Sequence, residues 1–209
     1  MSGPLHEPQV TIAGMDVGAR ERIAEYVKPL AVGLDGVTYY GDVERVVTAS
    51  EKIVAGRNDL DSDLLYLLAV FSGQEKWVSR FGHKSRTEIF LSSLGIEPRK
   101  IALLWRGLAR LEREPRTPEE EAVHDAVRLE ALGAYGIARQ LLEGYRERMD
   151  FLEIADSIDA AATVSLRTSA GRALAEPRVA AMKEFSRRLR EEYREFSGSA
   201  PPPTGRGPG

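Results

Sequence analysis

The run Asp63–Phe71, DLLYLLAVF, constrains the fold of this chain most because it is apolar on almost every side. An element that faces water needs a polar face, so a run of this kind belongs inside a core, as a helix or a strand. Its leucine content and its lack of a β-branched run favour a helix. The sequence therefore predicts a buried central helix with amphipathic elements packed around it.

The flanking sequence shows the three- and four-residue spacing of amphipathic helices, and no stretch alternates convincingly as a strand would. Thr117–Glu120 is the clearest helix start, with an N-cap, a proline at the first position and a glutamate at the third. We expect the all-α class, with an irregular arm at 1–15, one helical domain at 16–197 and a disordered tail at 198–209. The expected helices are 17–32, 42–54, 63–71, 85–94, 98–114, 118–142 with a glycine interruption, 150–163 and 173–196.

Composition excludes several partners and chemistries. A chain of 209 residues that is 43% hydrophobic can bury one full core. Its net charge of −3 gives no basic field that would draw it to nucleic acid or to a membrane surface, and no apolar run approaches the roughly 20 residues of a membrane span. The absence of cysteine excludes thiolate chemistry and fits the cytoplasm. Only 6 of the 29 basic residues are lysine, which suggests a GC-rich bacterial genome.

The stretch Val123–Arg139, VHDAVRLEALGAYGIAR, follows the strong helix start and holds a cluster of polar residues. A helical wheel drawn at 100° per residue places Val123, Val127 and Glu130 on the inward, apolar stripe. It points His124, Asp125 and Arg128 toward solvent. A carboxylate on an apolar stripe should have a raised pKa unless it is paired, so Glu130 is the candidate for acid–base chemistry.

Two stretches resemble a known family. VHDAVRLEALGAYGIARQLLEG is similar to the V-x-D-A-D-R-L-D-A-I-G-A-x-G-I-A-R stretch of YedJ-like members of the HD superfamily. LRTSAGRALAEPRVAAMKEF resembles the stretch near the C-terminus of that family, T-x-x-G-R-x-L-A-x-x-R-x-x-x-M-x-x-F. The resemblance implies an HD-domain-like helical bundle and an ancestry among metal-dependent phosphohydrolases. It also implies that Thr168–Arg172 and Arg178 form a polar network that anchors the last helix.

The resemblance further implies three ligand places: an early His, an adjacent His-Asp pair ending a buried helix, and a distant Asp. In this sequence these places fall at Asp42, at Val70–Phe71 and at Val127, so the family's residues are absent from all of them. Asp125 would replace the distant Asp if the register shifted. We therefore expect a degenerate HD-fold protein that has lost the metal ligands and holds no metal or other cofactor.

The candidate site has two groups of residues. Glu130 and Asp42 are the candidate catalytic residues. An ion pair of Glu130 with Arg45 or Arg139, and an N-cap role for Asp42, are the structural alternatives. The apolar replacements suggest either a pocket recast for an apolar ligand or a cavity filled by core side chains. The candidate substrate-binding residues are Val70, Phe71, Val127, Tyr135 and His83.

Three functions follow, in order of preference. The first is binding of an apolar small molecule, with or without its transformation by metal-free acid–base chemistry, in a setting such as bacterial specialised metabolism. The second is a non-catalytic protein that acts by association, as a homodimer for example, through the charged RRLREEYREF segment of the last helix. The third is a residual metal-dependent phosphohydrolase that uses Asp42, Asp125 and Glu130.

Overall fold

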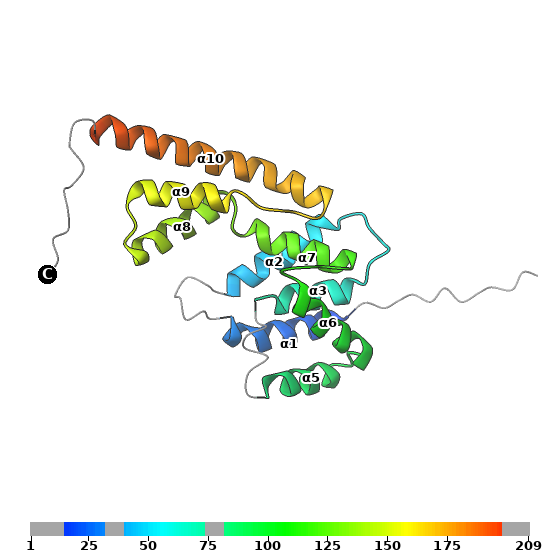
Figure 1. Ribbon diagram of the computed structural model, residues 1–209. Coiled ribbons are helices and arrows are strands. Elements are labelled where there is room, and N and C mark those ends of the chain that lie inside the picture. The colour runs from blue at the N-terminus through cyan, green and yellow to red at the C-terminus, as the bar shows by residue number, and fades with distance from the viewer. Residues whose placement is uncertain (1–14, 32–39, 74–81, 198–209) are drawn as a thin grey trace, which may run out of the picture.

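The computed structural model describes residues 15–31, 40–73 and 82–197, and within these ranges every regular element is a helix (Figure 1). The predicted all-α class is confirmed. The predicted tail and all of the predicted arm except Met15 lie outside the described residues. None of the described helices is long and apolar enough to cross a membrane. The elements are α1 (Val17–Val27), the 3₁₀ turn η1 (Lys28–Leu30), α2 (Tyr40–Ile53), α3 (Ser62–Phe71), α5 (His83–Ser93), α6 (Pro98–Arg110), α7 (Pro118–Leu129), α8 (Gly133–Glu147), α9 (Phe151–Ala161) and α10 (Ser169–Ser197).

Helix α3 is the centre of the larger part of the molecule, as its sequence predicts. Every residue from Asp63 to Phe71 is buried, and the helix packs against α1, α2, α6 and α7. Its start is fixed by Asp61, whose carboxylate accepts hydrogen bonds from the Asp63 and Leu64 amides. Lys100 of α6 neutralises this helix end through ion pairs of 2.9 Å to Asp61 and 3.0 Å to Asp63. The apolar run is therefore a buried helix with a polar, well-satisfied start.

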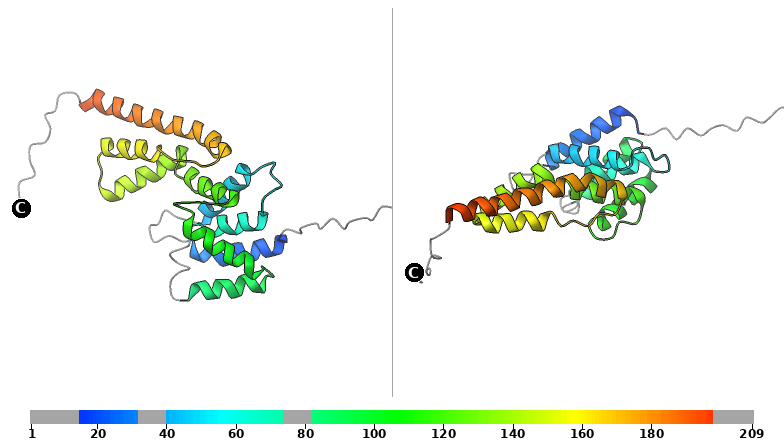
Figure 2. Two further views of the ribbon diagram at one scale, coloured as in Figure 1. Left: turned by 45° about the vertical axis from the view of Figure 1, so that its right-hand side comes forward. Right: turned by 90° about the horizontal axis from the view of Figure 1, so that it is seen from above.

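The helices α8, α9 and α10 form a second layer that projects away from the bundle around α3 (Figure 1, Figure 2). The 29-residue helix α10 packs along α9 and α8, and its first part reaches α7. Arg190 of α10 binds Asp156 and Asp159 of α9 at 2.6 and 2.8 Å. The predicted charged segment therefore forms ion pairs within this layer.

The predicted start of α5 is wrong for a local reason, whereas the glycine interruption predicted within 118–142 is confirmed. Helix α5 begins at His83, after Gly82 in the left-handed conformation (φ 74°), and it has no side-chain cap at that end. The helix start predicted at residue 85 is therefore two residues too late. Helices α7 and α8 are separate because the chain turns after Leu129 and Gly133 adopts a φ of 76°. The predicted start of α7 is confirmed, since the Thr117 side chain accepts from the Glu120 amide at 3.4 Å.

The predicted inward facing of Val123 and Glu130 is confirmed, but the predicted orientation of His124, Asp125 and Val127 is wrong. Asp125 is 0% exposed and His124 is 3% exposed, whereas Val127 is 38% exposed. The wheel assumed that one face of α7 is buried, but α2, α3 and α10 contact this helix from several directions. The polar side toward α10 is buried because its groups are hydrogen-bonded, which offsets the cost of removing them from water.

Asp125 ties α7 to the lead-in of α10. Its Oδ1 accepts from the Arg167 amide at 2.8 Å, and its Oδ2 accepts from the amide and hydroxyl of Thr168 at 2.8 and 2.7 Å. The His124 ring lies between two partners, with Nδ1 2.9 Å from Asp125 and Nε2 2.7 Å from Arg128 Nε. Because Arg128 can only donate, Nε2 is the acceptor, and Nδ1 donates to Asp125. The anchoring role of Thr168 agrees with the family resemblance.

We expect Asp125→Ala to lower the free energy of unfolding by about 3–5 kcal/mol, because it leaves several buried donors without an acceptor. Urea denaturation followed by circular dichroism measures this change. Asp156→Ala removes a carboxylate that is largely exposed, and we expect a loss below about 1 kcal/mol. Equal losses in the two variants would contradict the anchoring role of Asp125.

Candidate functional site

A cluster of charged and aromatic side chains lies where α2 meets the α7–α8 turn. Arg45 Nε donates to Glu130 Oε2 at 2.7 Å, and the Arg45 guanidinium stacks 3.7 Å from the centre of the Tyr135 ring. The Tyr135 hydroxyl donates a short hydrogen bond to Asp42, and Arg139 Nη2 binds the other oxygen of Asp42 at 3.2 Å. The structure thus brings together Asp42, Tyr135 and Glu130, three of the residues predicted from the sequence.

Helical spacing and one tight turn place these groups. Asp42 and Arg45 lie three residues apart on α2, and Tyr135 and Arg139 lie four apart on α8, so each pair shares a helix face. The turn from α7 to α8 depends on Gly136, where an added Cβ atom would lie 2.1 Å from a backbone oxygen. Asp42 is the third residue of α2 and not its N-cap, which corrects the structural alternative for this residue.

Burial sets the electrostatics of Glu130. The residue is 9% exposed, and this burial raises the pKa of its carboxyl group, while Arg45 acts in the opposite direction. The negative charge of Asp42 raises the pKa further, and Arg178 lowers it. The net direction is upward, so Glu130 is paired with Arg45, as one alternative predicted, and its pKa lies above that of an ordinary glutamate.

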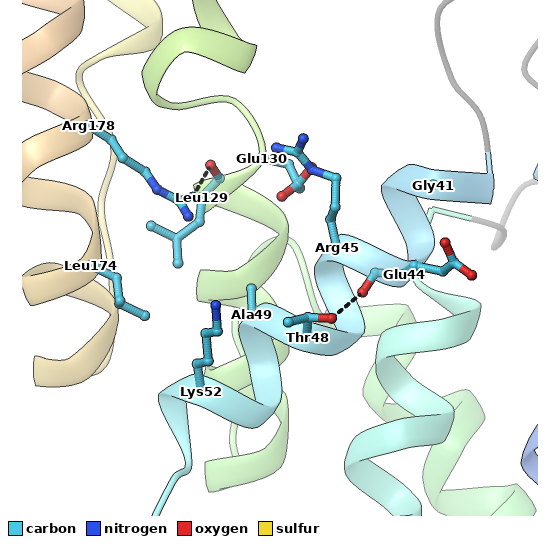
Figure 3. A pocket seen from close by; sticks show the side chains of 10 residues that line it. All are labelled: Gly41, Glu44, Arg45, Thr48, Ala49, Lys52, Leu129, Glu130, Leu174 and Arg178. Carbon is cyan, nitrogen blue, oxygen red and sulfur yellow. Dashed lines mark hydrogen bonds and ion pairs between the residues drawn. The ribbon is translucent and has the colours of Figure 1, made fainter.

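A cleft of about 310 Å³ opens beside this pair, between α2, the end of α7 and α10 (Figure 3). Arg45 and Glu130 form one end of it. Leu129 and Leu174 form its wall, and Lys52 of α2 and Arg178 of α10 also line it. Lys52 and Arg178 were not predicted to take part in a site. Arg178 had been assigned only an anchoring role, which the hydrogen bond from its Nη1 to the Leu129 carbonyl oxygen at 3.0 Å supports.

The remaining predicted residues lie elsewhere. Val127 lines a separate cleft of about 440 Å³ with Ser72, Gly73 and Ala131, so Val127 and Glu130 do not face one space. Val70 and Phe71 are fully buried in the core, where Phe71 packs near Trp105 with ring centres 6.4 Å apart. A ligand cannot touch them in this conformation.

His83 begins α5, a helix that packs on α6 and, through the stacking of Phe90 on Tyr26, on α1. Figure 1 shows α5 at the end of the bundle opposite α10, away from α8. The structure therefore does not bring His83 to the cluster around Glu130.

The donor set present does not fit a metal ion. Within residues 15–31, 40–73 and 82–197, no group of three or more His, Asp or Glu side chains converges on one point. Asp125, the substitute for the distant Asp, accepts from two amides, one hydroxyl and one imidazole, which uses the lone pairs that a cation would need.

Comparisons with known proteins identify the fold. No family model and no curated protein match this sequence. Bacillus subtilis YpgQ, solved in complex with ADP, is 20% identical with a TM-score of 0.63, over 84% of this chain and 95% of that chain. The Lin1889 protein of Listeria innocua is 21% identical with a TM-score of 0.66, over 84% and 97%. An HD-superfamily hydrolase of Bacillus thuringiensis is 18% identical with a TM-score of 0.62, over 87% and 98%. The predicted HD-domain-like bundle is confirmed as the fold.

We expect the carboxyl group of Glu130 to titrate above its ordinary pKa of 4.5, measured by carbon-detected NMR. Arg45→Gln should raise that pKa further, and Asp42→Asn should lower it, because the two side chains act on Glu130 with opposite sign.

The same shift predicts a pH dependence of stability. The folded protein holds the Glu130 proton more tightly than the unfolded chain does, so this group stabilises the fold below about pH 4.5. That contribution is lost as the pH rises through the raised pKa. Glu130→Gln should remove this part of the pH dependence. An unchanged pH profile in the variant would count against the shift.

Proposed function

We propose that this protein is a degenerate member of the HD-hydrolase fold that binds a small molecule with an apolar body in the cleft between α2 and α10. The observation that carries this proposal is Glu130, a buried carboxyl group with a raised pKa at the edge of an open cleft. Carboxyl groups in clefts whose pKa is shifted by burial and by nearby charges are candidates for functional sites. Loss of the metal ligands is part of the proposal, with apolar residues at Val70, Phe71 and Val127.

The cleft suggests how such a protein could act on its ligand. Because its pKa is raised, Glu130 takes up a proton more readily than an ordinary glutamate and can exchange it with a ligand atom in the cleft, while Arg45 fixes the orientation of its carboxyl group. The Tyr135 ring and Asp42 hold Arg45 and Arg139 in place from the other side. We infer that Glu130 is the acid–base residue and that Asp42 is a positioning residue. Specialised metabolism in a bacterial cytoplasm remains the proposed setting.

Protein association is a second candidate function, favoured by one surface. Near the α8–α9 turn, Tyr145 is 82% exposed and Phe151 is 57% exposed, and Leu142 of α8 is also exposed. Large apolar side chains exposed near one another are typical of contact surfaces. The homodimer predicted from the sequence would use this projecting layer.

The binding proposal is tested by thermal unfolding with neutral probes such as hexanol and naphthol in the presence of EDTA. We expect a bound probe at 100 times its Kd to stabilise the protein by about 2.7 kcal/mol and to raise Tm by about 5–10 °C. Thr48→Trp, which fills this cleft, should abolish the shift. Ala131→Trp, which fills the cleft beside Val127, should leave it unchanged.

Two further results bear on the alternatives. If a transformed ligand is found, Glu130→Gln should reduce kcat by about 10²- to 10⁴-fold with a small change in binding. Hydrolysis of ADP, the ligand bound in the YpgQ structure, that depends on added Mn²⁺ would favour the residual phosphohydrolase and overturn the metal-free proposal.

The association alternative predicts a dimer in size-exclusion chromatography with light scattering. Tyr145→Glu should convert that dimer to a monomer, because it places a charge on the exposed surface of α8. Glu143→Lys, on the same helix, serves as a control for a change of charge. A wild-type protein that is monomeric at high concentration contradicts this alternative.

A further inference from the structure

Two cationic groups that line the cleft, Lys52 and Arg178, have unused hydrogen-bonding capacity. Lys52, in the last turn of α2, forms no ion pair or hydrogen bond with any described residue. Arg178 of α10 uses Nη1 to bind the Leu129 carbonyl oxygen at 3.0 Å, and its other N–H groups have no acceptor among the described residues. Figure 3 shows both side chains pointing into the gap between α2 and α10.

The acidic residues of the cleft do not neutralise these two cations. Glu130 is paired with Arg45 at 2.7 Å, so that pair carries little net charge. Glu44 lies at the opposite end of the lining, and Figure 3 shows its carboxylate turned away from Lys52. The space between Lys52 and Arg178 therefore has a net positive charge.

The cleft also has an apolar wall with a fixed geometry. Leu129 is fully buried at its floor, and Ala49 and Leu174 border it. Arg178 is held in place because its aliphatic part packs on Gly133, where an added Cβ atom would lie 3.3 Å from Arg178 Cγ. A rigid guanidinium presents a fork of donors to a carboxylate or phosphate, and a lysine ammonium adds a point charge.

We infer that the ligand of this cleft is an amphiphilic acid, with a carboxylate or phosphate monoester bound by Lys52 and Arg178 and a short apolar body lying along Ala49 and Leu174 toward Glu130. This inference rests on the proposed function and names the class of its ligand. A cleft of about 310 Å³ accommodates an acid with a body of about six carbon atoms. The anionic group lies between Lys52 and Arg178, and the apolar body extends toward Glu130.

A purely structural role of Lys52 predicts a different result. A lysine in the last turn of a helix stabilises the partial negative charge of the helix C-terminus. Such a role would make Lys52→Gln less stable without changing ligand binding. Arg178→Gln also breaks the anchor to Leu129, so Lys52 is the better residue for the test.

The experiment compares four probes by isothermal titration calorimetry at low salt: hexanoate, hexyl phosphate, hexanol and inorganic phosphate. We expect hexanoate or hexyl phosphate to bind at least about tenfold more tightly than hexanol or phosphate alone, and the advantage to shrink as salt is added. Lys52→Gln should weaken binding of the favoured acid about tenfold while leaving hexanol unchanged. Lys183→Gln, which removes the same charge from an exposed position on α10 outside this cleft, should have no effect.

The outcomes separate the two proposals. Hexanol bound as tightly as both acids, or acids unaffected by Lys52→Gln, overturns the inference about the anionic group and leaves the binding proposal intact. No binding of any probe with an apolar body overturns the proposed function and this inference with it. Tighter binding of hexanoate than of hexyl phosphate identifies a carboxylic acid, and the reverse order identifies a phosphate monoester.

Discussion

The cost of burying a carboxylate governs how this molecule is assembled. Asp125 is withdrawn from water on α7, and it is tolerated because the lead-in of α10 supplies three donors to it and His124 supplies a fourth. A helix of 29 residues is thereby joined to the bundle at a defined angle. One consequence is the position of Arg178, which reaches the end of α7 and closes one side of the cleft.

The cluster next to this contact between α7 and α10 combines groups with opposite effects on the pKa of Glu130. Arg45 lowers the pKa of Glu130, whereas burial and the negative charge of Asp42 raise it. Tyr135 lies against Arg45 and donates to Asp42, so the aromatic ring and the two ion pairs form one connected unit. Burying such a unit costs free energy, and its contacts fix the side-chain orientations, as a preorganised binding site requires. The cleft beside this cluster supplies the space for a ligand.

The sequence could predict elements whose signals are local. The all-apolar α3 and the capped start of α7 are recognisable from a few consecutive residues, and the Arg45–Glu130 pair could be anticipated because an acid on an apolar stripe needs a partner. The orientations of the Asp125 and Val127 side chains could not be predicted from the sequence. A helical wheel assumes one buried side, whereas α7 has several neighbours. The cleft could not be predicted from the sequence either. Its walls on α2 and α10 lie more than a hundred residues apart in the chain and meet only through tertiary packing.

That separation has a consequence for how the protein is made. The wall on α2 is complete once Lys52 has been synthesised, yet the opposing wall requires Leu174 and Arg178 of α10. A nascent chain therefore has no cleft until nearly the whole domain has left the ribosome. A ligand can bind and stabilise only the complete fold. A small molecule in this cleft would therefore stabilise complete chains and leave truncated ones unprotected.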